Sequence, residues 1–167
     1  MIVYFRKAGV PVAIGFPLYI DLKDNNCTIF GGGEDAYEAA VTLRRFHAKV
    51  TVISPTICEQ LQAMDDNGEI RYLRRKYFRG DCSSARLCIA LTEDPTLNIA
   101  ISDECKNKSI PVAVNKPQGF GTFTMPRAAI ADDVVVTVSG SASEQLLRHI
   151  TARVDEQLGD WIHSFDA

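Results

Sequence analysis

The fold of this chain is decided by the stretch Cys27-Thr28-Ile29-Phe30-Gly31-Gly32-Gly33-Glu34-Asp35-Ala36. A short apolar run leads into three consecutive glycines, and apolar residues at helical spacing follow at once. The order Gly31-x-Gly33-x-x-Ala36 has the spacing of a dinucleotide-binding fingerprint, in which a tight turn brings the start of a helix close to a pyrophosphate. The N–H groups and the dipole at that helix end attract phosphates. Such a triplet can also be a plain strand-to-helix turn, but the flanking pattern favours a nucleotide site.

The composition is that of an ordinary globular protein. The chain has 167 residues, of which 46% are hydrophobic and 23% charged, and this length allows one sizeable core with a small appendage. The net charge of −3 argues against binding to nucleic acid. The apolar stretch over 10–20 contains Pro11 and Pro17 and is too short to cross a bilayer, so we expect no membrane association.

The five cysteines indicate reduced thiols. Their number is odd and none forms a C-x-x-C pair, which fits neither a disulfide framework nor a zinc site. Reduced thiols favour a cytoplasmic protein. Because the histidines also lack ligand spacing, we expect no metal to be bound by side chains. Cys27 and Cys88 lie in apolar runs typical of strands and are expected to be small core residues.

Strands and helices alternate along the first two thirds of the chain. An edge strand is expected over 17–22, followed by strands over 27–30, 49–53, 69–74, 86–91 and 110–114. The expected helices cover 34–47, a segment capped by 54–56 that runs through Asn67, and 95 to about 106. The five strands from residue 27 on, alternating with helices, predict an α/β fold with a Rossmann-like, doubly wound parallel sheet. Because ligands bind beyond the carboxyl ends of such strands, we expect the site at the loops 31–35, 54–56, 92–95 and 115–117.

The pattern changes after Pro117. Two strands are expected over 122–129 and 134–139, forming a hairpin around Asp132-Asp133, and a helix over 143–158. A hairpin and one helix bury too little surface to stand alone, so this part is expected to pack on the same element of a second subunit. The chain is thus divided into a nucleotide-binding domain over 1–116 and a small α+β dimerisation segment over 117–167.

With these loops placed, the chain resembles the precorrin-2 dehydrogenase/sirohydrochlorin ferrochelatase family, of the siroheme synthase N-terminal domain type. The resemblance covers about residues 16–158 and rests on separate blocks in the same order. The blocks are Pro17-Leu18-Tyr19-Ile20-Asp21-Leu22, Gly31-Gly32-Gly33-Glu34-Asp35-Ala36, Val50-Thr51-Val52-Ile53-Ser54-Pro55, Ala90-Leu91-Thr92-Glu93-Asp94-Pro95 with Asn98, Ile110-Pro111-Val112-Ala113-Val114-Asn115, Phe123-Thr124-Met125-Pro126 and Val136-Thr137-Val138-Ser139-Gly140.

The resemblance implies an oxidoreductase that acts as a homodimer in siroheme or cobalamin (porphyrin-type) biosynthesis. Its members use NAD to oxidise precorrin-2, a tetrapyrrole with eight carboxylates, to sirohydrochlorin, and some also act as a ferrochelatase or insert cobalt. They usually continue with more C-terminal helices that help enclose the tetrapyrrole, whereas this sequence ends at Ala167. The basic pair that usually follows the glycine loop is replaced here by Glu38-Ala39.

The resemblance also singles out Asn115 as a candidate catalytic position. Family members have an aspartate there that is implicated in dehydrogenation and chelation, and an amide cannot accept a proton at pH 7. Water, His149 or Glu93 would have to replace the lost base, and His149 is a candidate because histidine titrates near neutrality. The alternative to an active enzyme is therefore a catalytically impaired homologue that binds NAD or a tetrapyrrole.

Candidate cofactor-binding residues lie in three of the loops. They are Gly31, Gly32, Gly33, Glu34, Asp35, Ser54, Pro55, Thr56, Thr92 and Glu93. No acidic residue follows the second strand to bind a ribose 2′-hydroxyl, so both NAD and NADP remain open.

Candidate substrate-binding residues lie in the C-terminal segment. Arg127 and Arg148 are expected to bind the acetate and propionate groups, because a guanidinium can hold a carboxylate through two hydrogen bonds. Ser139 is grouped with them on the resemblance. The basic run over 71–79 is interpreted as a solvated face.

Overall fold

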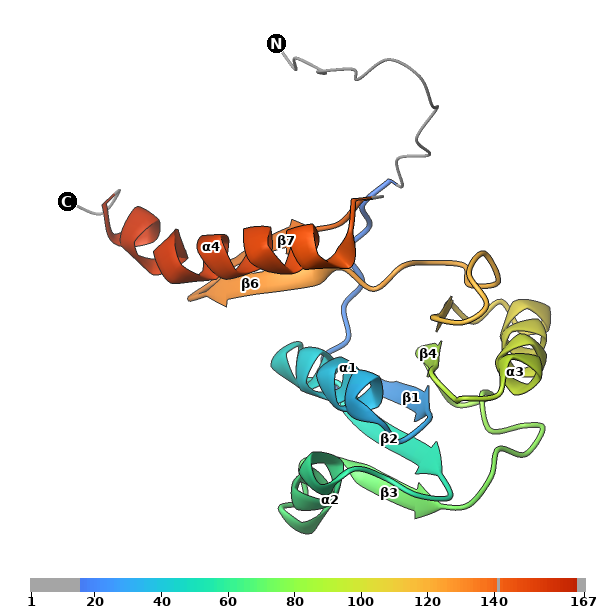
Figure 1. Cartoon of the computed structure of the whole chain (residues 1–167). Helices are drawn as coiled ribbons and strands as arrows, with labels where there is room; N and C mark the ends of the chain where they lie inside the picture. Colours follow the sequence, from blue (N-terminus) through green and yellow to red (C-terminus); the bar gives the residue numbers. More distant parts are fainter. Residues whose placement is uncertain (1–15, 141, 165–167) are drawn as a thin grey trace, which may run out of the picture. The chain divides into compact units, whose positions relative to one another are not determined.

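The computed structural model describes residues 16–140 and 142–164 (Figure 1). The chain divides into two compact units. One is Ile20–Met125, and the other comprises, of the described residues, 16–19 together with 126–140 and 142–164. No helix in the described part of the chain is both long and apolar enough to cross a membrane.

The first unit is built on a five-stranded parallel sheet with the order β3-β2-β1-β4-β5. The strands are β1 (Asn26–Phe30), β2 (Lys49–Ser54), β3 (Arg71–Arg74), β4 (Leu87–Ala90) and β5 (Val112–Val114). The chain builds outward from β1 in one direction and then returns to add β4 on the other side of β1. The topological switch point therefore lies between β1 and β4, where such sheets bind ligands. The predicted doubly wound parallel sheet is confirmed.

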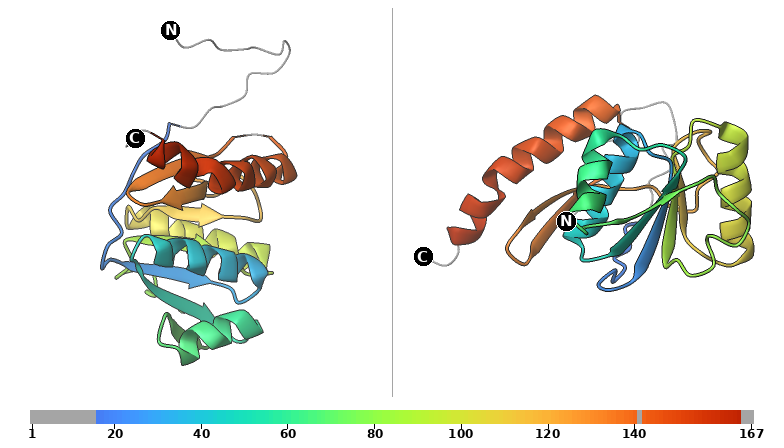
Figure 2. Two further views of the ribbon diagram at one scale, coloured as in Figure 1. Left: turned by 90° about the vertical axis from the view of Figure 1, so that its left-hand side faces the viewer. Right: turned by 90° about the horizontal axis from the view of Figure 1, so that it is seen from below.

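The helices cover both faces of this sheet (Figure 2). They are α1 (Glu34–Arg45), α2 (Glu59–Asp66) and α3 (Pro95–Asn107). Successive strand residues point to opposite faces, so Ile29 packs in the core under α1 and α2, and the next residue, Phe30, packs in the core under α3. With both faces covered, the central strands are almost continuously apolar, as the sequence pattern indicated.

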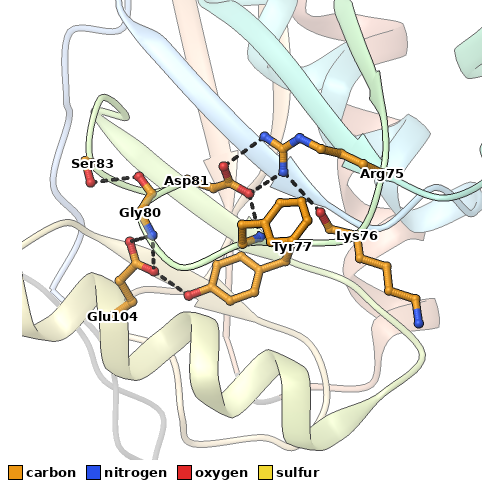
Figure 3. A network of polar contacts seen from close by, with 8 residues as sticks. Arg75, Lys76, Tyr77, Gly80, Asp81, Ser83 and Glu104 are labelled. Atoms are coloured by element: carbon orange, nitrogen blue, oxygen red, sulfur yellow. Dashed lines mark hydrogen bonds and ion pairs between the residues drawn. The ribbon is translucent and has the colours of Figure 1, made fainter.

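The connection from β3 to β4 crosses the sheet without a helix and is held by a polar network (Figure 3). Arg75 binds Asp81 through two hydrogen bonds of 2.7 and 2.9 Å. Glu104 of α3 accepts hydrogen bonds from the Tyr77 hydroxyl, from the Gly80 N–H at 3.0 Å and from the Lys108 ammonium at 2.8 Å. Burial raises the pKa of Glu104, but these donors outweigh burial and bring the pKa to about 2. The buried carboxylate thus fixes the connection to α3.

The second unit contains a hairpin and a long helix. Strands β6 (Arg127–Ala131) and β7 (Val134–Val138) pair antiparallel, and Asp132 at the turn has a φ of 48°. Helix α4 (Glu144–His163) packs on the hairpin, and the Ser143 hydroxyl caps its start by accepting the Leu146 N–H at 3.3 Å. The predicted hairpin and helix are both present, and the helix extends beyond the expected end at residue 158.

Two strand predictions were wrong, one entirely and the other in part. Residues 17–22 form no strand, because the sheet has β3 and β5 as its edges and no ladder reaches this segment. The strand predicted over 122–129 begins only at Arg127. Thr122 lies beside β5 instead, where its N–H donates to the Val112 carbonyl at 2.7 Å. Residues 117–125, which we expected to belong with the hairpin, are therefore part of the sheet unit.

Helix α2 begins later than predicted. Residues 54–56 were expected to cap it, but Cys58 occupies the N-cap position and provides no side-chain cap. The Cys58 N–H donates to the Gly32 carbonyl at 2.7 Å. The loop after β2 therefore packs against the glycine turn, and α2 begins only after this contact.

Candidate dinucleotide-binding site

The glycine triplet forms a turn that side chains would obstruct. Gly31 has a φ of 122°, and a Cβ atom there would lie 2.4 Å from the Leu91 carbonyl oxygen. A Cβ atom on Gly32 would lie 2.0 Å from the Thr56 carbonyl oxygen. These two glycines therefore let the turn pack closely between the loops that follow β4 and β2.

Gly33 differs from the other two glycines. It is the N-cap residue of α1, it is exposed, and a Cβ atom there would meet nothing within 4 Å. No side chain caps the helix at this position. The helix start therefore offers its main-chain N–H groups and positive dipole end to open space, a geometry that suits a diphosphate.

Buried Asn98 of α3 ties together the loops after β4 and β5. Its side-chain oxygen accepts from the Thr92 N–H at 3.1 Å and lies 2.7 Å from the Thr92 hydroxyl. Its amide nitrogen donates to the carbonyl oxygens of Thr92 at 2.9 Å and of Lys116 at 2.8 Å. In the sequence, Asn98 stands within a family-like block without a predicted role. Asn98 can be recognised as a polar residue on the inner side of a helix only when the orientation of α3 on the sheet is known.

Asn115 and Asp35 are joined across the first unit. The Asn115 amide donates to the Asp35 carboxylate at 2.8 Å, although the two residues are 80 positions apart in the sequence. Beside them, Gln60 donates to the Glu34 carboxylate at 3.3 Å. The glycine turn and the loop after β5 therefore meet at the carboxyl ends of the strands, and they bring an acceptor carboxylate next to Asn115.

The structure thus brings together the predicted residues of the first unit. The triplet with Glu34 and Asp35, the loop of Ser54, Pro55 and Thr56, the loop of Thr92 and Glu93, and Asn115 all follow the carboxyl ends of β1, β2, β4 and β5. Most of these side chains are exposed, and Ser54 is buried. Their role in binding a cofactor stays a prediction.

The other four predicted site residues belong to the second unit. Arg127 on β6 binds Glu144 at 2.7 Å, and Arg148 on α4 lies 3.6 Å from the same carboxylate. Ser139 follows β7, and His149 is exposed on α4. Both arginines thus lie close to the exposed Glu144 carboxylate of the same chain, which a polycarboxylate ligand would have to displace. Their role in substrate binding also stays a prediction.

Curated siroheme synthases are among the relatives of this chain. The chain is 36% identical over 142 residues to a siroheme synthase of Thioalkalivibrio sulfidiphilus, covering 84% of this chain and 29% of the relative. It is 36% identical over 147 residues to a siroheme synthase of Nitrosospira multiformis, covering 85% of this chain and 31% of the relative. The chain therefore spans less than a third of the length of these curated relatives.

A solved structure shares the fold. The protein titled SirC, precorrin-2 dehydrogenase, superposes with a TM-score of 0.72 at 20% identity, covering 89% of this chain and 76% of that chain. The relatives and this structure confirm the resemblance found in the sequence. Residues 18–127 match the family described as "Putative NAD(P)-binding", which agrees with the predicted cofactor class. The chain therefore belongs to this family of NAD(P)-binding domains.

Proposed function

We propose that this protein is an NAD-dependent dehydrogenase that oxidises precorrin-2 to sirohydrochlorin. The observation that carries the proposal is the open start of α1 at Gly33, which lies at the switch point of a doubly wound sheet. The similarity to siroheme synthases and the fold of a precorrin-2 dehydrogenase support the choice of substrate.

The glycine turn would hold the dinucleotide through its main chain. The N–H groups at the start of α1 bind the diphosphate, and Gly33 leaves room for it. Thr92 and Glu93 border the nicotinamide side, in a loop fixed by Asn98. When bound, NAD accepts a hydride from the substrate, and the protein contributes mainly by holding the two reactants in a fixed orientation.

Oxidation also releases protons, and Asp35 is the acceptor that the geometry favours. Its carboxylate lies 2.8 Å from the Asn115 amide, and so beside the position where the resemblance expects an aspartate. Asn115 orients this carboxylate by donating a hydrogen bond, because it cannot accept a proton itself. His149 is a second candidate acceptor, on the helix of the other unit.

The alternative function is a homologue that binds NAD or a tetrapyrrole without turnover. Asn115 favours it, because the position that family members fill with an aspartate holds a neutral amide. Ferrochelatase activity would need the same proton acceptor, since insertion of iron displaces two pyrrole protons.

We further propose that the protein is a cytoplasmic homodimer. Three large apolar side chains of α4 are exposed, with Leu146 at 49%, Ile150 at 40% and Trp161 at 47%, and pairing with the same element of a second subunit would cover them. The five cysteines are free thiols, which fits a reducing compartment. Light scattering of Leu146→Asp against wild type tests the dimer, which the variant should dissociate.

The activity is tested by mixing the full chain with precorrin-2 and NAD under anaerobic conditions. We expect NADH and sirohydrochlorin to appear in equal amounts, and the same assay with NADP identifies the preferred cofactor. Asp35→Asn should lower turnover at least about a hundredfold, and the exchanged pair Asp35→Asn with Asn115→Asp should restore part of it. NAD binding without any NADH would favour the homologue that binds but does not catalyse.

A further inference from the structure

Among the described residues, three cysteines converge in the core on the α3 side of the sheet. Cys82 lies in the β3–β4 connection, Cys88 on β4 and Cys105 on α3, and all three are fully buried. Their sulfur atoms all lie within 4.8 Å of one another. Three separate elements therefore present one sulfur each to a single point.

The spacing of these sulfurs suits one metal ion. Zinc–thiolate bonds are about 2.3 Å long, so sulfurs around one tetrahedral ion lie about 3.8 Å apart. Small side-chain rotations would bring sulfurs within 4.8 Å of one another to that separation. A set of sulfur ligands without oxygen or imidazole selects thiophilic ions over magnesium, calcium or manganese.

The charge of the site favours a divalent ion. Three thiolates carry three negative charges, so a divalent ion leaves one negative charge and a monovalent ion leaves two. Burying a net charge costs free energy, so the complex with one negative charge is favoured over the complex with two.

The surrounding network holds two of the three cysteine backbones in place. Asp81, next to Cys82, accepts from Arg75 at 2.7 and 2.9 Å and from the Phe78 N–H at 2.8 Å. Glu104, next to Cys105, accepts from the Gly80 N–H at 3.0 Å (Figure 3). The connection and α3 are thus fastened together immediately beside the sulfurs, and ligands fixed by such outer contacts bind a metal at lower entropic cost.

We propose that Cys82, Cys88 and Cys105 bind one thiophilic divalent metal ion of the zinc class, which fastens the helix-free β3–β4 connection to β4 and α3. Binding is a ligand exchange without redox change: one M²⁺ and three thiols give one tris-thiolate complex with a net charge of −1 and three released protons. The site shares no residue with the glycine turn, so it is independent of the proposed dehydrogenase function. The cysteine spacing in the sequence predicted no such site, because none of the three forms a C-x-x-C pair and they lie on three different elements.

The test uses the full reduced chain with Cys58→Ser, which removes the partly exposed thiol outside the cluster. Co²⁺ is titrated into the native protein and also added during refolding from urea, because the site is buried. We expect a sulfur-to-cobalt charge-transfer band that saturates at one ion per chain and is displaced by Zn²⁺. In urea below the unfolding midpoint, bound Zn²⁺ should slow the reaction of three of the four remaining thiols with a thiol reagent, and it should raise the melting temperature by about 5 °C or more.

Single substitutions then assign the ligands. Cys88→Ala and Cys105→Ala should each abolish the band or weaken binding at least about tenfold, whereas Cys27→Ala should leave it unchanged. Cys27 is the matched control, since it is equally buried but packs in the core on the other face of the sheet. No stoichiometric uptake by the wild-type cluster would overturn the proposal and identify the cysteines as plain core packing. A band retained in both cluster variants would overturn it as well. If neither variant folds, the parent chain in urea decides, because equal thiol reactivity with and without Zn²⁺ would overturn the proposal.

Discussion

Replacing Gly33 with valine separates the fold of the glycine turn from its binding role. Gly33 has a φ of −85° and a ψ of −169°, an extended conformation that any residue adopts. A Cβ atom there meets nothing within 4 Å, so the protein has room for the new side chain. The valine would instead fill the space above the start of α1, where we propose that the diphosphate lies.

The expected magnitudes differ for stability and for binding. An apolar residue at an N-cap lowers the free energy of unfolding by about 1 kcal/mol relative to glycine. Valine also reduces the conformational entropy of the unfolded chain, which offsets about half of that loss. The free energy of unfolding should therefore fall by less than about 1 kcal/mol. A hydrogen bond to a charged group contributes roughly 1.5 to 3 kcal/mol, so losing one main-chain bond to the diphosphate should weaken NAD binding roughly 10- to 100-fold.

Calorimetric titration with NAD and urea unfolding measure the two quantities on the same protein. Gly159→Ala is the matched control, because a Cβ atom on this helical glycine of α4 also meets nothing within 4 Å. It should bind NAD as wild type does and be slightly more stable. A folded Gly33→Val protein with wild-type affinity for NAD would refute the assignment of the diphosphate to this turn.

Four other predictions concern the first unit. Gly32→Ala should lower the free energy of unfolding by at least about 2 kcal/mol in urea, because its Cβ atom would lie 2.0 Å from a carbonyl oxygen. Asn98→Ala should cost about 3 kcal/mol, because it leaves buried partners of both loops unpaired. The pKa of Glu104 is lowered from 4.5 to about 2, so this carboxylate contributes up to about 3 kcal/mol to the free energy of unfolding. The contribution is complete above pH 5 and is lost as the pH falls toward 2. Glu104→Gln should therefore make the free energy of unfolding depend less on pH between 5 and 2. Asp35→Asn should lower the rate of precorrin-2 oxidation at least about a hundredfold and change NAD affinity less than about threefold.

Each of these has an outcome that contradicts it. A Gly32→Ala protein as stable as wild type would mean that the loop after β2 shifts freely. Asn98→Asp tests whether the amide donors matter, and wild-type stability in that variant would dismiss the cross-loop role. If the free energy of unfolding falls equally with pH in wild type and Glu104→Gln, the Glu104 network does not cause the loss of stability in acid. Unchanged turnover in Asp35→Asn would exclude Asp35 as the proton acceptor and leave His149 to be tested.

The sheet could be predicted from the sequence because its strands and helices carry strong local patterns. The apolar runs around Cys27–Phe30 and Lys49–Ser54 are buried on both faces, and the glycine triplet marks the turn between a strand and a helix. The failures lie where tertiary contacts decide. Residues 17–22 alternate like a strand but find no partner edge, and Thr122 bonds to β5 rather than starting the hairpin.

The loops of the candidate site could be predicted from topology, but their mutual contacts could not. Parallel strands bring their carboxyl ends together, so the positions of Gly33 and Asn115 followed from the strand order. The hydrogen bond from Asn115 to Asp35 joins residues 80 positions apart, and the cluster of Cys82, Cys88 and Cys105 joins three different elements. Such pairs leave no periodic signal, and they become visible only when the three-dimensional arrangement is known.

The central claim is that a nicotinamide dinucleotide binds with its diphosphate over the glycine turn. A crystal structure of the full chain grown with NAD tests it most directly. We predict that the diphosphate oxygens lie within hydrogen-bonding distance of the main-chain N–H groups at Gly33, Glu34 or Asp35. A dinucleotide bound elsewhere on the protein, with this turn open to solvent, would contradict the account.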